Sequence, residues 1–176
     1  MTTKTATLQW AGTGLRLEVE TGSGHHLVLD DAEGNGGPRP AELLVVALGG
    51  CTAMDVVSIL RKKRQVITRY QVRVTGEQRD DRHPHVYRTF DVLHVVEGPE
   101  VDEAAVRRAI ELSAYRYCTV TAQLAAGIAE IRHRYLLRRA EGDGIEERSG
   151  EVAVTGPAID PDALALLAEP SSRGSS

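Results

Sequence analysis

The sequence predicts an α+β domain with mostly antiparallel strands, and two patterns lead to this prediction. Short segments in which apolar and polar residues alternate recur along the 176-residue chain, and alternation is the period of a half-buried strand. One long apolar segment, Leu43 to Leu60, has the composition of a buried helix. The expected order of elements is βββ-α-ββ-α-α-β, which is typical of an α+β fold.

Three short strands are expected near the N-terminus. Ala6, Leu8 and Trp10 alternate with polar residues, and the alternation continues in "LRLEVE" and "HHLVLDD". The segments "AGTG" and "TGSG" separate these runs. Strands joined by such glycine-bearing turns form an antiparallel meander.

A helix is expected from Pro40 to about Arg64. Proline suits the first turn of a helix, and the basic run "RKKR" complements the negative charge at its C-terminal end. The apolar part is long enough to span a membrane. Thr52, Asp55 and a glycine pair interrupt it, so we expect a deeply buried helix of a soluble protein and no membrane partner.

The glycine pair, Gly49-Gly50, lies in the middle of this helix directly before Cys51. Each glycine costs about 1 kcal/mol relative to alanine in a helix interior. Two explanations stay open. The pair could kink the helix and release backbone amides near Cys51, or it could let another segment pack closely against the helix.

The rest of the chain predicts a hairpin, two helical segments and a last strand. Tyr70 to Thr75 and Tyr87 to Val96 alternate as two strands joined by a polar turn. Asp102 and Glu103 open a helix, and a short helical piece follows around Thr119 to Ala126. The helix is expected to bury Val106, Ala109, Ile110, Ser113 and Tyr117, and the last strand is expected to share one face among Ile131, His133, Tyr135 and Leu137.

The pattern weakens from about Ala140. We therefore expect one domain over residues 1–139 and a flexible C-terminal extension over residues 140–176, in which Asp160 to Glu169 could form a short amphipathic turn of helix.

Composition limits the class of function. The formal net charge is -4 and aromatic residues make up 4% of the chain, so we expect no nucleic-acid partner. No secretory signal is visible, which favours a cytoplasmic location. No motif for a metal, a nucleotide or a flavin is present, and no cofactor is expected.

The chain has two cysteines, Cys51 and Cys118. They are either two inert buried thiols or a redox pair. Asp55 follows Cys51 by one helical turn, where its carboxylate would disfavour a thiolate unless it pairs with a residue such as Arg61. Glu42 is either a first-turn acid that complements the helix dipole or a carboxylate that orients a partner in the site.

Two segments resemble a known family. "GGPRPAELLVVALGGCTAMDVVSIL" and "AIELSAYRYCTV" resemble the OsmC/Ohr family of osmotically induced and organic-hydroperoxide-resistance proteins, over roughly Thr5 to Leu137. "RKKRQ" and "LSAYRYC" are most similar to its YhfA-like branch. The resemblance implies an intertwined homodimer in which antiparallel sheets wrap around two central helices, with the active sites at the dimer interface.

The resemblance also implies a reaction. Cys51 would be the peroxidatic cysteine that reduces an organic hydroperoxide, and Cys118 would be the resolving cysteine that forms a disulfide with it. A dithiol reductant, such as a lipoyl-type protein, would restore both thiols. Glu42 matches the acidic residue of the family. The alternative implied function is a stress protein without enzymatic activity that binds a small hydrophobic ligand at the dimer interface.

The chain departs from the family at one position. Well-characterised members use an arginine from the N-terminal hairpin region, and the corresponding stretch, "TGSGHHLVLDD", contains none. His25 or His26 could replace it as a donor, and neither Arg16 nor Arg39 aligns with it from sequence alone.

Overall fold

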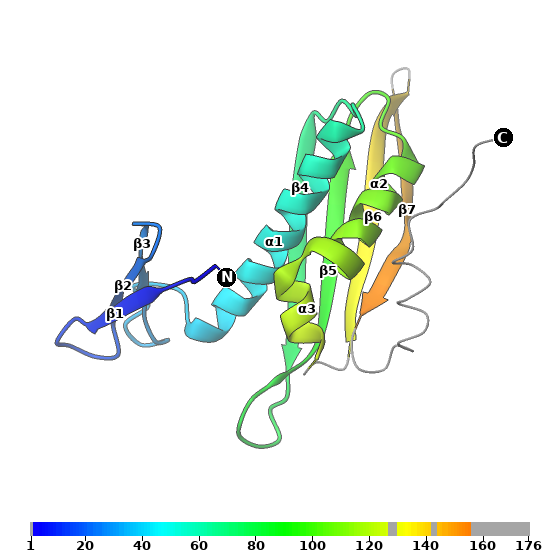
Figure 1. The fold of residues 1–176 in the computed structure, drawn as a ribbon. Helices are drawn as coiled ribbons and strands as arrows, with labels where there is room; N and C mark the ends of the chain where they lie inside the picture. Colours follow the sequence, from blue (N-terminus) through cyan, green and yellow to red (C-terminus); the bar gives the residue numbers. More distant parts are fainter. Residues whose placement is uncertain (1, 127–129, 142–143, 156–176) are drawn as a thin grey trace. The chain divides into compact units, whose positions relative to one another are not determined.

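The computed structural model describes residues 2–126, 130–141 and 144–155, which belong to two compact units, Met1–Val46 and Ala47–Ser176 (Figure 1). The first unit contains a three-stranded antiparallel sheet in the order β1-β2-β3. Its strands are β1 (Ala6–Trp10), β2 (Leu17–Thr21) and β3 (His26–Leu29). This confirms the predicted meander.

The second unit contains a four-stranded sheet in the order β4-β5-β6-β7. Its strands are β4 (Arg69–Gln78), β5 (Tyr87–Glu97), β6 (Glu130–Glu141) and β7 (Gly144–Thr155). β4 and β5 form the predicted hairpin, and β6 runs parallel to β5. A parallel neighbour requires a long crossover, and the chain between β5 and β6 makes it with helices that cover one face of the sheet (Figure 1). The α+β class is confirmed.

Strand β7 corrects the prediction that the chain from residue 140 onward is a flexible extension. β7 pairs antiparallel with β6 from Gly144 to Thr155. The first half of β7 is mostly exposed, and burial marks only its end, at Ala153 and Thr155. Its sequence therefore shows little alternation of apolar and polar residues. The strand forms because the edge of β6 offers backbone hydrogen-bonding groups. The amphipathic turn expected at 160–169 lies outside the described residues.

Helix α1 (Pro40–Lys62) is continuous through the glycine pair, so the alternative in which the pair interrupts the helix is not seen. The steric explanation holds for Gly49, because a Cβ atom there would lie 2.9 Å from Val74 Cγ2 of β4. A Cβ atom on Gly50 would meet nothing within 4 Å. Gly49 therefore allows the close approach of α1 to β4, and Gly50 has no such role within the single chain.

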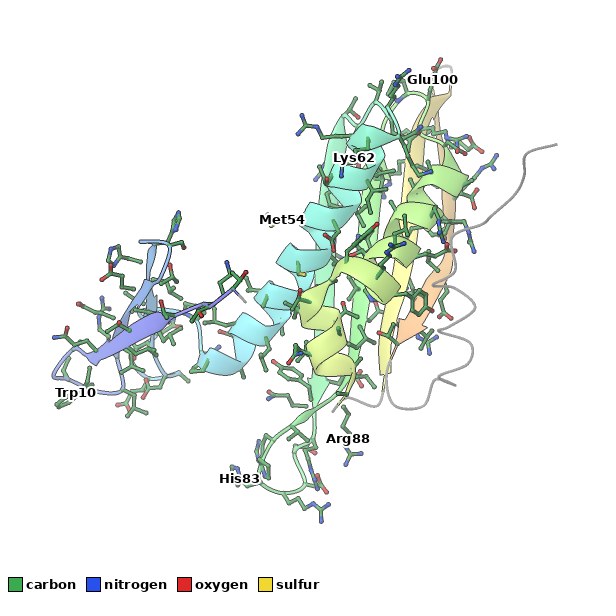
Figure 2. The ribbon with its side chains drawn as sticks, in the orientation of Figure 1. Trp10, Met54, Lys62, His83, Arg88 and Glu100 are labelled. Carbon is green, nitrogen blue, oxygen red and sulfur yellow. The ribbon has the colours of Figure 1, made fainter. Side chains whose placement is uncertain are left out.

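Only one face of α1 is buried in the single chain. Its buried side chains are Leu48, Thr52, Val56 and Leu60, at intervals of one helical turn. Met54 is 76% exposed and projects from the side of α1 away from the sheet (Figure 2). Within the described residues, α1 is long and apolar enough to cross a membrane by length and composition, yet only 22% of its most apolar window is buried. The expectation of a deeply buried helix is therefore wrong for the chain alone.

The crossover contains α2 (Glu103–Leu112), a π-helical turn η1 (Ser113–Tyr117) and α3 (Thr119–Ala125). Asp102 caps α2 by accepting from the amides of Ala104 and Ala105. The expected burial of this segment holds except at Tyr117, which is 49% exposed. The π turn adds backbone to each turn of helix and so shifts Tyr117 out of the helical phase assumed for it.

The main core of the second unit lies between the helices and the sheet. The face expected for the last strand is confirmed, because Ile131, His133, Tyr135 and Leu137 are all buried. The core cluster joins α1, β5, α2 and β6 through Val56, Leu60, Val96, Val101, Ala105, Val106, Ala109, Ile110, Tyr135 and Leu137.

Candidate functional site

Cys51 and Cys118 meet in the second unit. One donor atom each from Cys51, Asp55 and Cys118 lies within 4.8 Å of the others. Both cysteines are free thiols, and Cys118 is buried whereas Cys51 is half-buried. The structure thus brings together the two sequence-predicted cysteines with Asp55, and these three residues are a group whose donors could hold a metal ion.

The backbone around Cys118 holds its sulfur at the start of α3. The Cys118 amide donates to Ser113 O at 2.9 Å, which closes the π turn, and Cys118 then leaves the helical conformation with φ −70° and ψ 101°. As the N-cap residue of α3, Cys118 accepts a hydrogen bond from the Thr121 amide through Sγ at 3.3 Å. Single π turns inside helices are often found at functional sites.

Asp55 is positioned from the opposite side by Ser113. Ser113 Oγ lies 3.0 Å from Asp55 Oδ2 and 2.9 Å from Thr52 Oγ1, at hydrogen-bonding distance from both. Ser113 and Thr52 are fully buried. Within the described part of the chain, Asp55 makes no ion pair with lysine or arginine, so the expected alternative of pairing with Arg61 is not seen.

The surroundings favour the protonated form of Cys118. Burial first, and the hydrogen bond with Cys51 second, raise the pKa of the Cys118 thiol to about 11. The Thr121 contacts lower it in part. Cys118 is therefore a neutral thiol at pH 7 and needs a proton acceptor before its sulfur can act as a nucleophile.

A buried polar chain of three rings lies on the helix-covered face of the sheet. The Tyr70 hydroxyl and His94 Nδ1 are 2.7 Å apart, and the rings of His94 and His133 stack with centroids 6.1 Å apart. Burial, and secondly the charge of Asp55, raise the pKa of Tyr70 well above its usual value.

The two buried histidines of this group, His94 and His133, are neutral at pH 7. Burial and the neighbouring His133 lower the pKa of His94 to about 3, and burial lowers the pKa of His133 to about 4 although Asp91 opposes this shift. His94 Nε2 and both ring nitrogens of His133 have no hydrogen-bond partner among the described residues.

Glu42 belongs to the first unit, where its partner is Arg39. Glu42 Oε2 accepts from the Arg39 amide at 2.8 Å, and Arg39 Nη2 lies 3.0 Å from Glu42 Oε1. Glu42 thus lies in the first turn of α1, as its first interpretation expects, and pairs locally with Arg39, whereas its role in a site stays a prediction. The spacing of three residues in "RPAE" is the sequence signal that could have identified Arg39. His25 and His26, the two histidines expected as alternative donors, are both exposed, and His25 contacts Ser23.

Sequence reasoning missed two further features of the site. Asp55 was considered only as an obstacle to a thiolate, whereas it is part of the same cluster as both sulfurs. Ser113 was expected only as a buried residue, whereas it links α2 to Asp55. A serine and an aspartate so far apart in sequence give no local signal of such a contact.

Comparison with known proteins shows which family this chain is similar to. A family model described as OsmC-like protein matches residues 32–132. The chain is 38% identical over 130 residues to Protein YhfA of Escherichia coli strain K12, and the match covers 74% of this chain and 95% of that protein.

Solved structures show a similar fold. A hypothetical protein from Aquifex aeolicus VF5 superposes with a TM-score of 0.71 at 27% identity, covering 80% of this chain and all of that one (100%). The organic hydroperoxide resistance protein OhrB of Bacillus subtilis superposes with a TM-score of 0.51 at 12% identity, covering 76% of this chain and 98% of that one, which shows a shared fold alone.

Proposed function

The chain belongs to the OsmC-like protein family, and on that premise we propose that it is a thiol-dependent peroxidase that reduces organic hydroperoxides. The observation that carries the proposal is the proximity of the Cys51 and Cys118 donor atoms, within 4.8 Å. A small side-chain rotation brings sulfurs at such a separation to bonding distance. Structural neighbours that are hydroperoxide resistance proteins support the same chemistry.

In the first step, the half-buried Cys51 is the nucleophile because it is the more accessible of the two thiols. Its thiolate attacks the terminal oxygen of the hydroperoxide, so that an S–O bond forms and the O–O bond breaks. The leaving alkoxide takes a proton and departs as the alcohol. Cys51 is oxidised to the sulfenic acid, and the hydroperoxide is reduced by two electrons.

In the second step, the Cys118 sulfur attacks the Cys51 sulfur, so that the S–S bond forms and the S–O bond breaks. The hydroxide that leaves needs a proton, and the Cys118 thiol must lose one. The Asp55 carboxylate lies within 4.8 Å of both sulfurs, which supports its role as the carrier of this proton. Water is the product, and an external dithiol then reduces the disulfide and is itself oxidised.

The proposal includes a homodimer in which α1 of each chain packs against the other. The uncovered side of α1 supports this dimer, because it exposes apolar side chains such as Met54, which is 76% exposed. Such a surface is costly in water and is typical of an interface. Glu42 would act at the site of this dimer, as the family resemblance implies.

A second candidate function is binding of a small hydrophobic ligand without catalysis. An open hollow of about 580 Å³ along α1 favours it, with Ala53, Met54 and Val57 on its apolar side and Arg61 and Lys62 at one end. This arrangement suits an apolar molecule with an anionic end. If this function holds, the protein binds such a ligand and has negligible turnover of hydroperoxides.

Steady-state turnover distinguishes the two. We expect the wild-type protein to oxidise dihydrolipoamide or dithiothreitol in the presence of an alkyl hydroperoxide, and Cys51→Ser to lose this activity. Ser149→Ala, a substitution at an exposed position of β7, is the matched control and should keep it. Equal turnover by Cys51→Ser and wild type would overturn the peroxidase proposal.

A further inference from the structure

The cysteine pair and Asp55 also have the composition of a metal site. Cys51 and Asp55 are one helical turn apart on α1, and Cys118 reaches the same point from the start of α3. Two sulfurs and one carboxylate oxygen therefore converge, with all three donor atoms within 4.8 Å of one another. Two sulfurs of a tetrahedral zinc site with Zn–S bonds of about 2.3 Å are roughly 3.8 Å apart. Donors at the separation seen here reach that geometry by small side-chain rotations.

We propose that Cys51, Asp55 and Cys118 bind a thiophilic divalent cation, with Zn²⁺ as the expected ion. The proposal concerns the same residues as the proposed peroxidase, and it rests on their geometry and not on the reaction. Thiolate ligands select zinc or a similar soft metal over Mg²⁺ or Ca²⁺, which prefer oxygen ligands only. Three protein ligands leave the fourth position of the metal for water.

The charges at the site favour a cation. Asp55 makes no ion pair with a basic residue in the described part of the chain, and its nearest polar partner is the Ser113 hydroxyl. Without a cation the two sulfurs can stay protonated beside this carboxylate. A bound divalent cation would displace the thiol protons, and the two thiolates and the carboxylate would then neutralise its charge.

The neighbouring residues hold the donors as they do in metal sites. Ser113 Oγ lies 3.0 Å from Asp55 Oδ2 and leaves the other carboxylate oxygen for a ligand. The Thr121 amide donates to Cys118 Sγ at 3.3 Å, a contact that also favours an anionic sulfur. Hydrogen bonds to ligating carboxylates and sulfurs are the usual outer contacts that orient metal ligands.

Zinc would compete with peroxide chemistry. A metal-bound Cys51 thiolate shares its electron pair with the ion and is less available to attack a hydroperoxide. Conversely, oxidation of Cys51 and Cys118 to a disulfide removes two of the three donors. The site therefore binds zinc only in its reduced state, and free zinc would inhibit the peroxidase.

The test is a Co²⁺ titration of the full-length, reduced and metal-free protein without any peroxide. We expect one equivalent to produce a sulfur-to-cobalt charge-transfer absorption and the visible bands of four-coordinate cobalt, and Zn²⁺ to displace both. Asp55→Asn, which keeps a hydrogen-bond acceptor for Ser113, should weaken Zn²⁺ binding about tenfold or more. The matched control is Glu111→Gln on α2, which should bind as wild type does.

Two results would overturn the site. One is a reduced wild-type protein that shows no charge-transfer absorption, or that binds Zn²⁺ equally well after alkylation of its cysteines. The other is Asp55→Asn with wild-type affinity, because Asp55 is then not a ligand. If Asp55→Asn does not fold, Cys51→Ser provides the comparison and should bind Co²⁺ more weakly, with a lower charge-transfer absorption because one sulfur ligand remains. Turnover assays play no part, so failure of the peroxidase proposal and failure of the zinc site are separate outcomes.

Discussion

Ser113 Oγ lies 3.0 Å from Asp55 Oδ2, which joins the residue that follows α2 to the middle of α1. Ser113 is fully buried and also contacts Thr52 at 2.9 Å. Through this contact the crossover that delivers Cys118 and the helix that carries Cys51 are fixed to each other. The site depends on one hydroxyl group that takes no part in the proposed chemistry.

Removing that hydroxyl should destabilise the fold. Ser113→Ala leaves the Asp55 carboxylate without its buried partner, which costs about 1–3 kcal/mol. Urea unfolding should show a loss of this size in the free energy of unfolding. Ser149→Ala at an exposed position of β7 should change it little, and an equal effect of the two substitutions would contradict the role of Ser113.

Removing the second sulfur should separate the two steps of the reaction. Cys118→Ser retains Cys51, so one equivalent of hydroperoxide should still convert Cys51 to a sulfenic acid. Without Cys118 the intramolecular disulfide cannot form, and the sulfenic acid should accumulate. Trapping with dimedone and mass spectrometry measures it. A variant that traps no more dimedone than wild type would contradict the assignment of Cys118 as the resolving cysteine.

The pH dependence of disulfide formation should reveal a proton acceptor. The pKa of Cys118 is raised to about 11 by burial and by the Cys51 contact, so its thiolate fraction grows about tenfold per pH unit between pH 7 and 10. If Asp55 accepts the proton, the wild-type rate should rise less steeply. Asp55→Asn should be slower at pH 7 and should show the full tenfold slope. Stopped-flow kinetics measure the rate of disulfide formation against pH in both proteins. Identical pH profiles would show that Asp55 does not accept the proton in this step.

The two glycines of α1 should respond oppositely to alanine. Gly49→Ala places a Cβ atom 2.9 Å from Val74 Cγ2, so the clash should offset the gain in helix propensity and lower the stability. Within the single chain, Gly50→Ala meets nothing within 4 Å, so α1 itself should gain about 0.5–1 kcal/mol from helix propensity. Thermal unfolding of the pair measures the difference. Equal stabilisation by both would contradict the close packing of α1 on β4.

Acid should destabilise the second unit through its buried histidines. The pKa of His94 falls to about 3 and that of His133 to about 4 in the folded state, from about 6.5 when unfolded. Above pH 6.5 both histidines are neutral in the folded and in the unfolded protein, and no stability is lost. Below it the unfolded state binds more protons, so stability falls by about 1.4 kcal/mol per pH unit for each histidine until the pH reaches the folded pKa.

Replacing one of these histidines tests the prediction. His133→Leu should flatten the decline in the free energy of unfolding between pH 6 and 4.5, and it also removes two buried nitrogens that have no partner among the described residues. His85→Gln at an exposed position should keep the wild-type slope. Urea unfolding at several pH values measures how the free energy of unfolding declines with acid. Equal declines for wild type, His133→Leu and His85→Gln would contradict the role of the buried histidines.

The sequence by itself determined the elements whose signals are local. Alternation placed Ala6, Leu8 and Trp10 on β1 and predicted the buried face of β6, because neighbouring residues of a strand point to opposite sides. Pro40 and Asp102 marked the starts of α1 and α2, because the capping of a helix is a local interaction. The two cysteine motifs identified the family.

Only the tertiary structure decided what depends on distant contacts. Strand β7 exists because β6 offers it an edge, although its own exposed half has no pattern. The meeting of Cys51 with Cys118, and the hydrogen bond between Ser113 and Asp55, join residues far apart in sequence. Local propensity carries no information about such pairs, because their energy arises only when packing brings the groups together and excludes water.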